Sequence, residues 1–163
     1  MDNDVIIQTL KEKYEADFVS AEMIDDFLTI TLRPDHIAEI IRYLYFHKDT
    51  KFQFLTSLCA VHYPDQDSIA VVYHLHNLVA NVRIRIRTFL PAADAVTQTI
   101  TDTFAGANWM ERETYDFFGV IFKGHPNLKR ILNVDDMIIF PLRKEYPLED
   151  QTREDKNDSM FGR

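Results

Sequence analysis

An apolar stripe with the spacing of a helix stands directly before three strand-like segments, and this order constrains the fold more than any other feature. Behind Pro34 and Asp35, apolar residues recur at i, i+3, i+4, i+7 and i+8, namely Ile37, Ile40, Ile41, Leu44 and Tyr45. This spacing predicts a helix with one face against a sheet. Residues 52–63, 68–78 and 82–90 predict the strands, with turn residues at 64–67 and 80–81.

Further elements flank this unit on both sides. Residues 3–14 predict a short amphipathic helix. Two short strands are predicted to follow as a hairpin, with the turn at 24–26 and the second strand at 27–32. After the three strands, Asp94 is predicted to cap a helix that carries Val96, Ile100 and Phe104 on one face. Together these elements predict an α+β fold, a two-layer sandwich of a mostly antiparallel or mixed sheet with helices.

The last thirty residues differ from the rest of the chain. From about Asn133 the apolar periodicity fades, and the sequence holds Pro141, Pro147 and a charge-mixed end. Such a segment has too little apolar content to fold alone, but it is suited to binding along the surface of another protein. We therefore predict a core domain over residues 1–132 and an extended partner-binding tail over 133–163.

Composition narrows the class of protein. The formal net charge of −8 argues against nucleic acid as the main partner, because phosphate binding needs a cationic field. The single cysteine, Cys59, excludes an internal disulfide and an iron–sulfur cluster held by this chain alone, and its apolar strand predicts a buried, inert thiol. No apolar run reaches the roughly 20 residues of a spanning helix, and no signal peptide is recognisable.

The stretch from Glu111 to Leu132 carries more charge than a core element needs. A helix is predicted over 109–118, with Asn108 and Glu111 at the spacing of a capping box and Gly119 as the stop. Asp116 falls in the last turn, where the helix dipole disfavours an anion. We predict that Lys129 and Arg130 supply the countercharge of Asp116, or that a basic residue of a partner chain does so. As an exposed charge, Asp116 changed to Lys should shift the melting temperature by no more than about 2–4 °C.

Two motifs in this region resemble the signature of a known family, the 30 kDa subunit of respiratory complex I, also called the C subunit of the bacterial NADH:quinone oxidoreductase. The first runs from Glu111 to Leu132, and the second is the Pro-Leu-Arg-Lys-acid-Tyr-Pro-Leu run at 141–148. The chain departs from the family pattern at Ile139-Phe140, where Gly-His is common. The residues assigned to the family motif and to a subunit interface are Glu111, Arg112, Glu113, Asp116, Phe117, Phe118, Gly119, His125, Pro126, Lys129, Arg130, Pro141, Leu142, Arg143, Tyr146 and Pro147.

The resemblance implies a non-catalytic core subunit of the peripheral arm of a proton-translocating NADH:quinone oxidoreductase. Such a subunit binds no flavin, metal or cluster; the partner subunits carry the iron–sulfur clusters and the quinone site. The implied partners are other peripheral-arm subunits, above all the quinone-site large subunit and the terminal-cluster subunit. The implied location is the cytoplasmic face of the bacterial inner membrane, with membrane contact only through the complex. An equivalent subunit of a ferredoxin-linked or hydrogenase-type membrane complex is the alternative.

Two other sets of residues allow different functions. His74 and His76 share one face of a predicted strand and, with His62, would suit a small metal-binding domain, although rim histidines are the more common explanation. Arg83, Arg85 and Arg87 alternate along the next strand, which predicts a solvated sheet face or an anchor for an acidic partner surface.

A small hydrolase is the third alternative. Glu111, Glu113, Asp116 and His125 would form its acid–base set. Nothing near them in the sequence offers a nucleophile or an oxyanion hole, so an independent enzyme is the weakest of these hypotheses.

Overall fold

A computed structural model describes residues 3–146. The helices are α1 (Asn3–Tyr14), α2 (Ile37–Phe46) and α3 (Ala107–Phe118), with short 3-10 turns at Pro64–Gln66 and Ala92–Asp94. The strands are β1 (Phe18–Ile24), β2 (Phe27–Leu32), β3 (Phe54–Tyr63), β4 (Ser68–Asn77), β5 (Val82–Pro91), β6 (Val96–Gln98) and β7 (Ile121–Lys123). The predicted order of elements is confirmed from α1 to β5.

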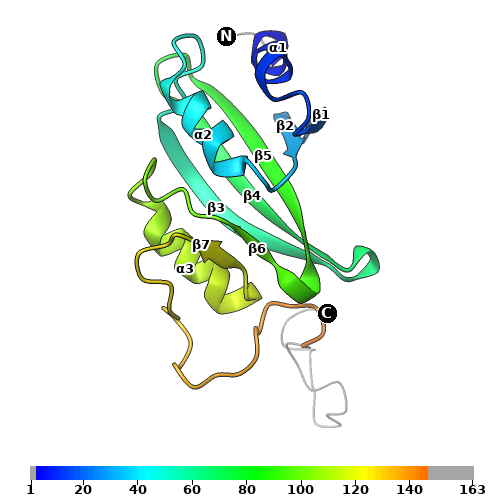
Figure 1. The fold of residues 1–163 in the computed structure, drawn as a ribbon, viewed down its shortest axis with the longest axis vertical. Helices are drawn as coiled ribbons and strands as arrows, with labels where there is room; N and C mark the ends of the chain where they lie inside the picture. Colours follow the sequence, from blue (N-terminus) through cyan, green and yellow to red (C-terminus); the bar gives the residue numbers. More distant parts are fainter. Residues whose placement is uncertain (1–2, 147–163) are drawn as a thin grey trace, which may run out of the picture.

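Five strands form one mixed sheet in the order β1-β2-β5-β4-β3. β2 and β5 run parallel, while the β1–β2, β3–β4 and β4–β5 pairs are antiparallel. α2 connects β2 to the far edge strand β3, and α1 and α2 lie over the same face of the sheet (Figure 1). The predicted α+β sandwich of a mixed sheet with helices is thus confirmed.

The core lies between this face and the helices. The predicted stripe on α2 is buried, because Ile37, Ile40, Ile41 and Leu44 are each 0% exposed. The sheet contributes the alternate residues that face α2, and the register aligns Ile86 of β5 with Ile30 on one side and Tyr73 on the other. Alternation therefore leaves the intervening residues on the opposite face of the sheet.

The prediction of a helix after Asp94 is wrong. Residues 96–98 form β6, which pairs in parallel with β7 through Val96–Ile121 and Gln98–Lys123. Because the three-residue strand β7 offers free backbone groups beside this segment, sheet pairing outweighs a weak helical pattern. The expected burial is nevertheless found, since Ile100 is 1% exposed and Phe104 is 7% exposed.

The prediction of a buried thiol is also wrong. Cys59 is exposed. It is paired with Val72 on β4, on the face that points away from α1 and α2, whereas its neighbours Leu58 and Ala60 point into the core. An apolar strand at a sheet edge still has two faces, and Cys59 occupies the outer one.

The end of the described chain returns to the body of the domain. Residues 124–146 contain no helix or strand, and backbone hydrogen bonds such as Leu142 N–H to the Phe117 carbonyl, 3.2 Å, hold them against α3. Pro147 and the remainder of the predicted tail lie outside the described residues, so the division at 132/133 stays a prediction. Across the described part, no helix has the length and apolar character to cross a bilayer.

Candidate subunit interface

α3 begins and ends differently from a simple capped helix. It starts at Ala107, earlier than the capping box predicts, and no side chain caps it. The capping box is therefore wrong, because the Glu111 side chain turns into the core instead of toward Asn108. The predicted stop is confirmed: Gly119 adopts a left-handed φ of 76°, and its N–H donates to the Tyr115 carbonyl at 2.8 Å.

Asp116 is the centre of a hydrogen-bond network that joins α3 to the chain 14–17 residues later. Its Oδ2 accepts from three consecutive backbone N–H groups, at 3.0 Å from Ile131, 2.8 Å from Leu132 and 2.9 Å from Asn133. Its Oδ1 accepts from the Asn133 side-chain amide at 3.0 Å. A carboxylate bound by several N–H groups is well compensated even when water is excluded.

Arg130 completes the network and extends it. Its Nη1 pairs with Asp116 Oδ1 at 2.8 Å, and the two side chains are 7% and 0% exposed. Its Nη2 donates to the carbonyl oxygens of Met137 and of Ile139, the latter at 3.0 Å. One buried guanidinium thus fixes the helix, the turn after it and residues 137–139 in a single arrangement.

These contacts decide the ionisation of Asp116. Burial acts to raise the pKa, but the Asn133 N–H, the Arg130 guanidinium and the Leu132 N–H outweigh it, and the pKa lies well below its ordinary value. The expectation of an exposed charge at Asp116 is therefore wrong, and so is the expectation that reversing it costs little. Of the predicted countercharges, Arg130 is confirmed, while the Lys129 side chain is exposed.

Residues 128–146, which we call the return segment, pass over the C-terminal end of α3. The Arg143 Nε donates to the Phe118 carbonyl at 2.7 Å, and the Lys144 N–H donates to His62 Nδ1 at 3.0 Å. The ring of Phe140 lies so close to Gly119 that a Cβ there would come within 2.5 Å of it. Gly119 is therefore needed for close approach as well as for its φ.

Phe140 also lies near two cations. The guanidinium carbons of Arg130 and Arg143 lie 5.3 and 5.1 Å from its ring centroid. Such contacts between a guanidinium and an aromatic face are attractive. The aromatic residue at this departure from the family pattern thus packs on the end of α3, against Gly119 and Tyr115.

Glu111 is the second fully buried acid of α3, at 0% exposed, but its surroundings are different. Oε1 accepts from the Ile100 N–H at 2.8 Å and Oε2 accepts from the Thr99 hydroxyl at 2.5 Å. Burial raises its pKa to about 7, and these two donors offset burial only in part. No basic side chain among residues 3–146 pairs with it.

The other motif residues either support the contact between α3 and the return segment, which we call the joint, or lie at its surface. Arg112 donates to the carbonyl oxygens of Lys129 and Arg130, at 3.2 and 3.0 Å, and not to Asp116. His125 Nδ1 accepts from the Asn127 N–H at 3.0 Å, so the protonated Nε2 donates to the Asn108 carbonyl at 3.1 Å. Glu113 and Pro126 are exposed, and the remaining described members are half-buried or, like Leu142, exposed; they are Phe117, Phe118, Pro141, Leu142, Arg143 and Tyr146.

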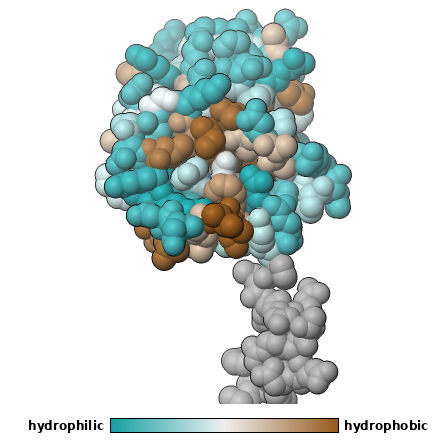
Figure 2. All heavy atoms as spheres, turned by 60° about the horizontal axis from the view of Figure 1, so that its bottom comes forward, coloured by the Kyte–Doolittle hydropathy of each residue, from teal (hydrophilic) through white to brown (hydrophobic). Residues whose placement is uncertain are grey.

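The return segment holds apolar side chains out in solvent. Figure 2 turns this end of the molecule forward and shows apolar residues gathered among polar ones. The exposed apolar side chains of the segment, which we call the ridge, are Leu132 at 66%, Val134 at 63%, Ile138 at 92% and Leu142 at 42%. Four large apolar side chains left exposed along one segment make that segment a candidate surface for another protein.

The residues of the predicted acid–base set and of the predicted histidine metal site do not come together. Glu111, Asp116 and His125 are each bound to separate groups, and Glu113 is exposed, so the four do not form an acid–base set. His62 pairs with Ile69 on the core-facing side of the sheet, whereas His74 and His76 lie on the opposite face. Within residues 3–146, His, Cys, Asp and Glu do not gather in groups of three that would hold a metal.

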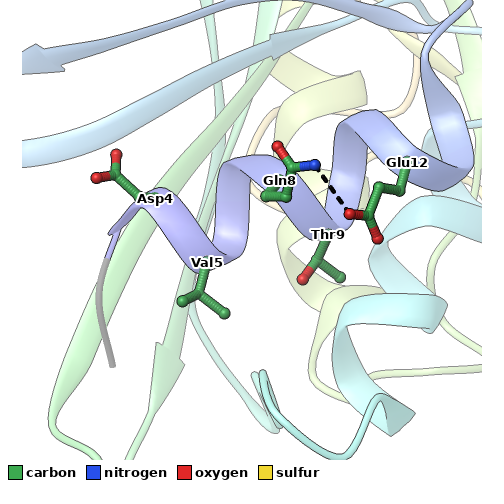
Figure 3. Close-up of a pocket in the computed structure, with 5 residues that line it drawn as sticks. All are labelled: Asp4, Val5, Gln8, Thr9 and Glu12. Carbon is green, nitrogen blue, oxygen red and sulfur yellow. Dashed lines mark hydrogen bonds between the residues drawn. The ribbon is translucent and has the colours of Figure 1, made fainter.

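The hollow along α1 offers no catalytic geometry either. The hollow drawn in Figure 3 follows α1 and is lined by Asp4, Val5, Gln8, Thr9 and Glu12, with Gln8 donating to Glu12 at 2.8 Å. All five residues come from one helix. A small molecule there would be contacted from one side, which is unlike the enclosing pockets of enzymes.

Sequence reasoning missed several members of the joint. Asn133 binds Asp116, Phe140 packs on Gly119, and Thr99 and Ile100 bind Glu111. The last pair could have been found only if the burial of Glu111 had been predicted, because a buried acid needs donors and Thr99 lies in the segment before α3. The backbone donors to Asp116 have no sequence signal, since any residue other than proline supplies an N–H.

Comparison with known proteins agrees with this architecture. The family described as respiratory-chain NADH dehydrogenase, 30 Kd subunit, matches residues 30–152. The NADH-quinone oxidoreductase C subunit of Citrifermentans bemidjiense is 38% identical over 154 residues, which is 94% of each chain. Its counterpart of the same name in Geobacter sulfurreducens is 34% identical over 155 residues, again 94% of each chain.

Solved structures show the same fold. A chain of the membrane-bound sulfane sulfur reductase, an archaeal respiratory membrane complex, superposes with a TM-score of 0.75 at 25% identity, covering 89% of this chain and 85% of that one. The trypsin-resistant fragment of Nqo5 gives 0.63 at 28% identity, covering 76% of this chain and 98% of the fragment. With its signature helix, left-handed stop and return segment inside the matched range, the chain belongs to the 30 kDa subunit family of the respiratory-chain NADH dehydrogenase.

Proposed function

We propose that this chain is a non-catalytic core subunit of the peripheral arm of a proton-translocating NADH:quinone oxidoreductase. It holds no flavin, cluster or quinone, and it supports the subunits that do, above all the quinone-site large subunit and the terminal-cluster subunit. It lies on the cytoplasmic face of the bacterial inner membrane and contacts the membrane through the complex alone. The names of its relatives, each a C subunit of NADH-quinone oxidoreductase, support this proposal.

The ridge is the observation that carries the scaffold role. Ile138 is 92% exposed although the buried pair of Arg130 and Asp116 fixes the backbone beside it. A buried ionic network stabilises a surface loop at considerable desolvation cost, and here its effect is to hold apolar side chains outward. Covering a fully exposed side chain of this size contributes about 1.5–3 kcal/mol before the costs of association, so the ridge can contribute to docking.

Substitution of the ridge tests the proposal. Ile138→Asp should leave the melting temperature of the isolated full chain nearly unchanged, because surface changes are usually within about 0.5 kcal/mol. It should strongly reduce the amount of this chain that co-purifies with the complex, since docking would bury the new carboxylate without a partner. Both quantities are measured by thermal denaturation and by affinity purification through a tagged partner subunit.

A matched control exists at the other end of the molecule. Val79 is 97% exposed in the β4–β5 turn, outside the return segment. Val79→Asp should leave co-purification intact. Equal loss with both variants, or normal co-purification of Ile138→Asp, would contradict the ridge as the docking element.

The likeness to the sulfane sulfur reductase chain favours one second candidate, the equivalent subunit of a ferredoxin-linked or hydrogenase-type membrane complex. The two functions share the ridge and differ in the electron donor of the parent complex. Quinone reduction by the purified complex with NADH supports the first candidate. Reduction that requires a ferredoxin, with no response to NADH, supports the second.

A further inference from the structure

The sheet has a second face, which α1 and α2 do not cover. We call it the bare face; it consists of the side chains of β1–β5 that point away from the core. Its central row is Arg83, Arg85 and Arg87 on β5, flanked by His74 and His76 on β4, as the register shows. β1–β5 contain no lysine and a single acid, Glu22, although the whole chain has 26 acidic residues.

Two of the arginines are held in fixed positions. Arg85 Nε donates to His74 Nε2 at 3.1 Å, and its guanidinium lies 5.3 Å from the centre of the Phe27 ring. Arg87 Nε donates to the Thr31 hydroxyl at 2.7 Å, and Arg87 also pairs with the Glu22 carboxylate. Planar groups fixed in this way lose little freedom when they bind a carboxylate.

The guanidinium of the third arginine, Arg83, is available to bind a partner. Arg83 is exposed, and among residues 3–146 no acid or acceptor binds its guanidinium. His74 adds no second charge, because burial and the neighbouring Arg85 lower its pKa. The guanidinium groups therefore supply positive charge to the bare face, with Glu22 offsetting part of it.

Apolar side chains lie beside this row. Phe54 is 46% exposed, Val61 is 39% exposed, and Cys59 is exposed between them on β3. A sheet face that meets only water ordinarily carries polar residues without exposed aromatic side chains. Arginine and aromatic residues with few lysines and acids are instead the composition of the central part of a protein–protein interface.

We infer that the bare face binds a carboxylate-rich surface of a partner subunit, as an interface separate from the ridge. Charge complementarity selects this partner, because the net charge of −8 repels acidic proteins elsewhere and this face attracts them. The exposed Phe54 and Val61 provide the apolar centre that such an interface buries. The inference rests on the proposed function in that it requires a parent complex.

Cys59 provides a direct test, because it is the single cysteine of the chain and lies on the bare face. Its rate of modification by a maleimide is measured in the isolated full chain and in the purified complex. Cover by a partner should slow the reaction about tenfold or more, since water is excluded from the centre of an interface. An unchanged rate in a complex that contains the chain overturns this inference and leaves the proposed function standing. Absence of the chain from every such complex overturns the proposed function instead.

Charge reversal tests the chemistry of the partner. Arg83→Glu should lower the KCl concentration that releases half of the chain from the complex by about twofold or more, because the contact is ionic. Arg42→Glu is the control, since Arg42 is also exposed but lies on α2, which covers the other face of the sheet. Equal salt sensitivity of the two variants overturns the inference. A dimer of the isolated chain with a slowly reacting Cys59 also overturns it, because the occupant would then be a second copy.

Discussion

The two ends of α3 each bury a carboxylate completely, yet the two carboxylates are shifted in opposite directions. Asp116, at the C-terminal end, has an arginine and three backbone N–H groups, and its pKa is lowered. Glu111, near the N-terminal end, has one N–H and one hydroxyl, and its pKa rises to about 7. Burial is the same at both ends, so the donors decide which acid remains ionised.

The comparison also separates two structural roles. The C-terminal end of α3 holds the return segment and its exposed ridge, so its charge is tied to the surface proposed to meet a partner. The N-terminal end holds the segment between β6 and α3, inside the domain. A motif that looks uniform in sequence thus contains one carboxylate that stays ionised and one that titrates near pH 7.

Removal of Asp116 should have the largest effect. Asp116→Ala leaves Arg130 buried without its partner, and breaking a buried ion pair in this way costs about 3–5 kcal/mol. Urea denaturation of the full chain measures the loss in the free energy of unfolding. Glu113→Ala, an exposed acid on the same helix, should change it by less than about 0.5 kcal/mol. Similar losses for both variants would show that Asp116 contributes no more than an exposed charge.

The glycines at the two ends provide the next contrast. Gly119→Ala should cost about 2–4 kcal/mol, because a left-handed residue gains a Cβ and that Cβ overlaps the Phe140 ring. Gly106→Ala meets no atom within 4 Å at a φ of −64°, so it should be neutral or slightly stabilising. A double-mutant cycle that combines Gly119→Ala with Phe140→Ala separates the steric part of the stability loss from the backbone part. Recovery of part of the loss identifies the steric component, and no recovery assigns all of it to the backbone.

The pH dependence of stability should give the smallest effect, and it comes from Glu111. Its folded pKa of about 7 exceeds its ordinary value of 4.5, so the folded state holds the proton more tightly. The stability it contributes is complete below pH 4.5 and is lost as the pH rises toward 7. Asp116 acts in the opposite sense and in another range, since its contribution is lost only as the pH falls below 3.8.

Glu111→Gln should remove the Glu111 component. Between pH 5 and pH 7, the difference in unfolding free energy between the two proteins should change by about 2 kcal/mol, given at most 1.4 kcal/mol per pH unit for one proton. Denaturation of both proteins at several pH values measures this difference and cancels the histidines common to them. A difference that stays constant across this range would mean that Glu111 is ionised in the folded chain.

Sequence reasoning succeeded where one face of an element decides its structure. The Ile37 stripe and the alternation of β4 and β5 are set by burial against a single layer, which periodicity records directly. It failed where a distant segment decides. β6 depends on pairing with β7, and the burial of Asp116 depends on backbone N–H groups of residues 131–133. The motif identified the region of the joint, but the groups that bind its buried acids could not be predicted from residue types.

The dependence of Asp116 on residues 130–133 has a consequence for biosynthesis. When α3 has left the ribosome, its last turn carries an acid whose compensating groups have not yet been translated. The helix end can therefore reach its final burial only after the return segment emerges. A message truncated before codon 130 would yield a polypeptide with every strand from β1 to β7 but with the last turn of α3 uncovered and Asp116 in water, a product suited to recognition by proteases.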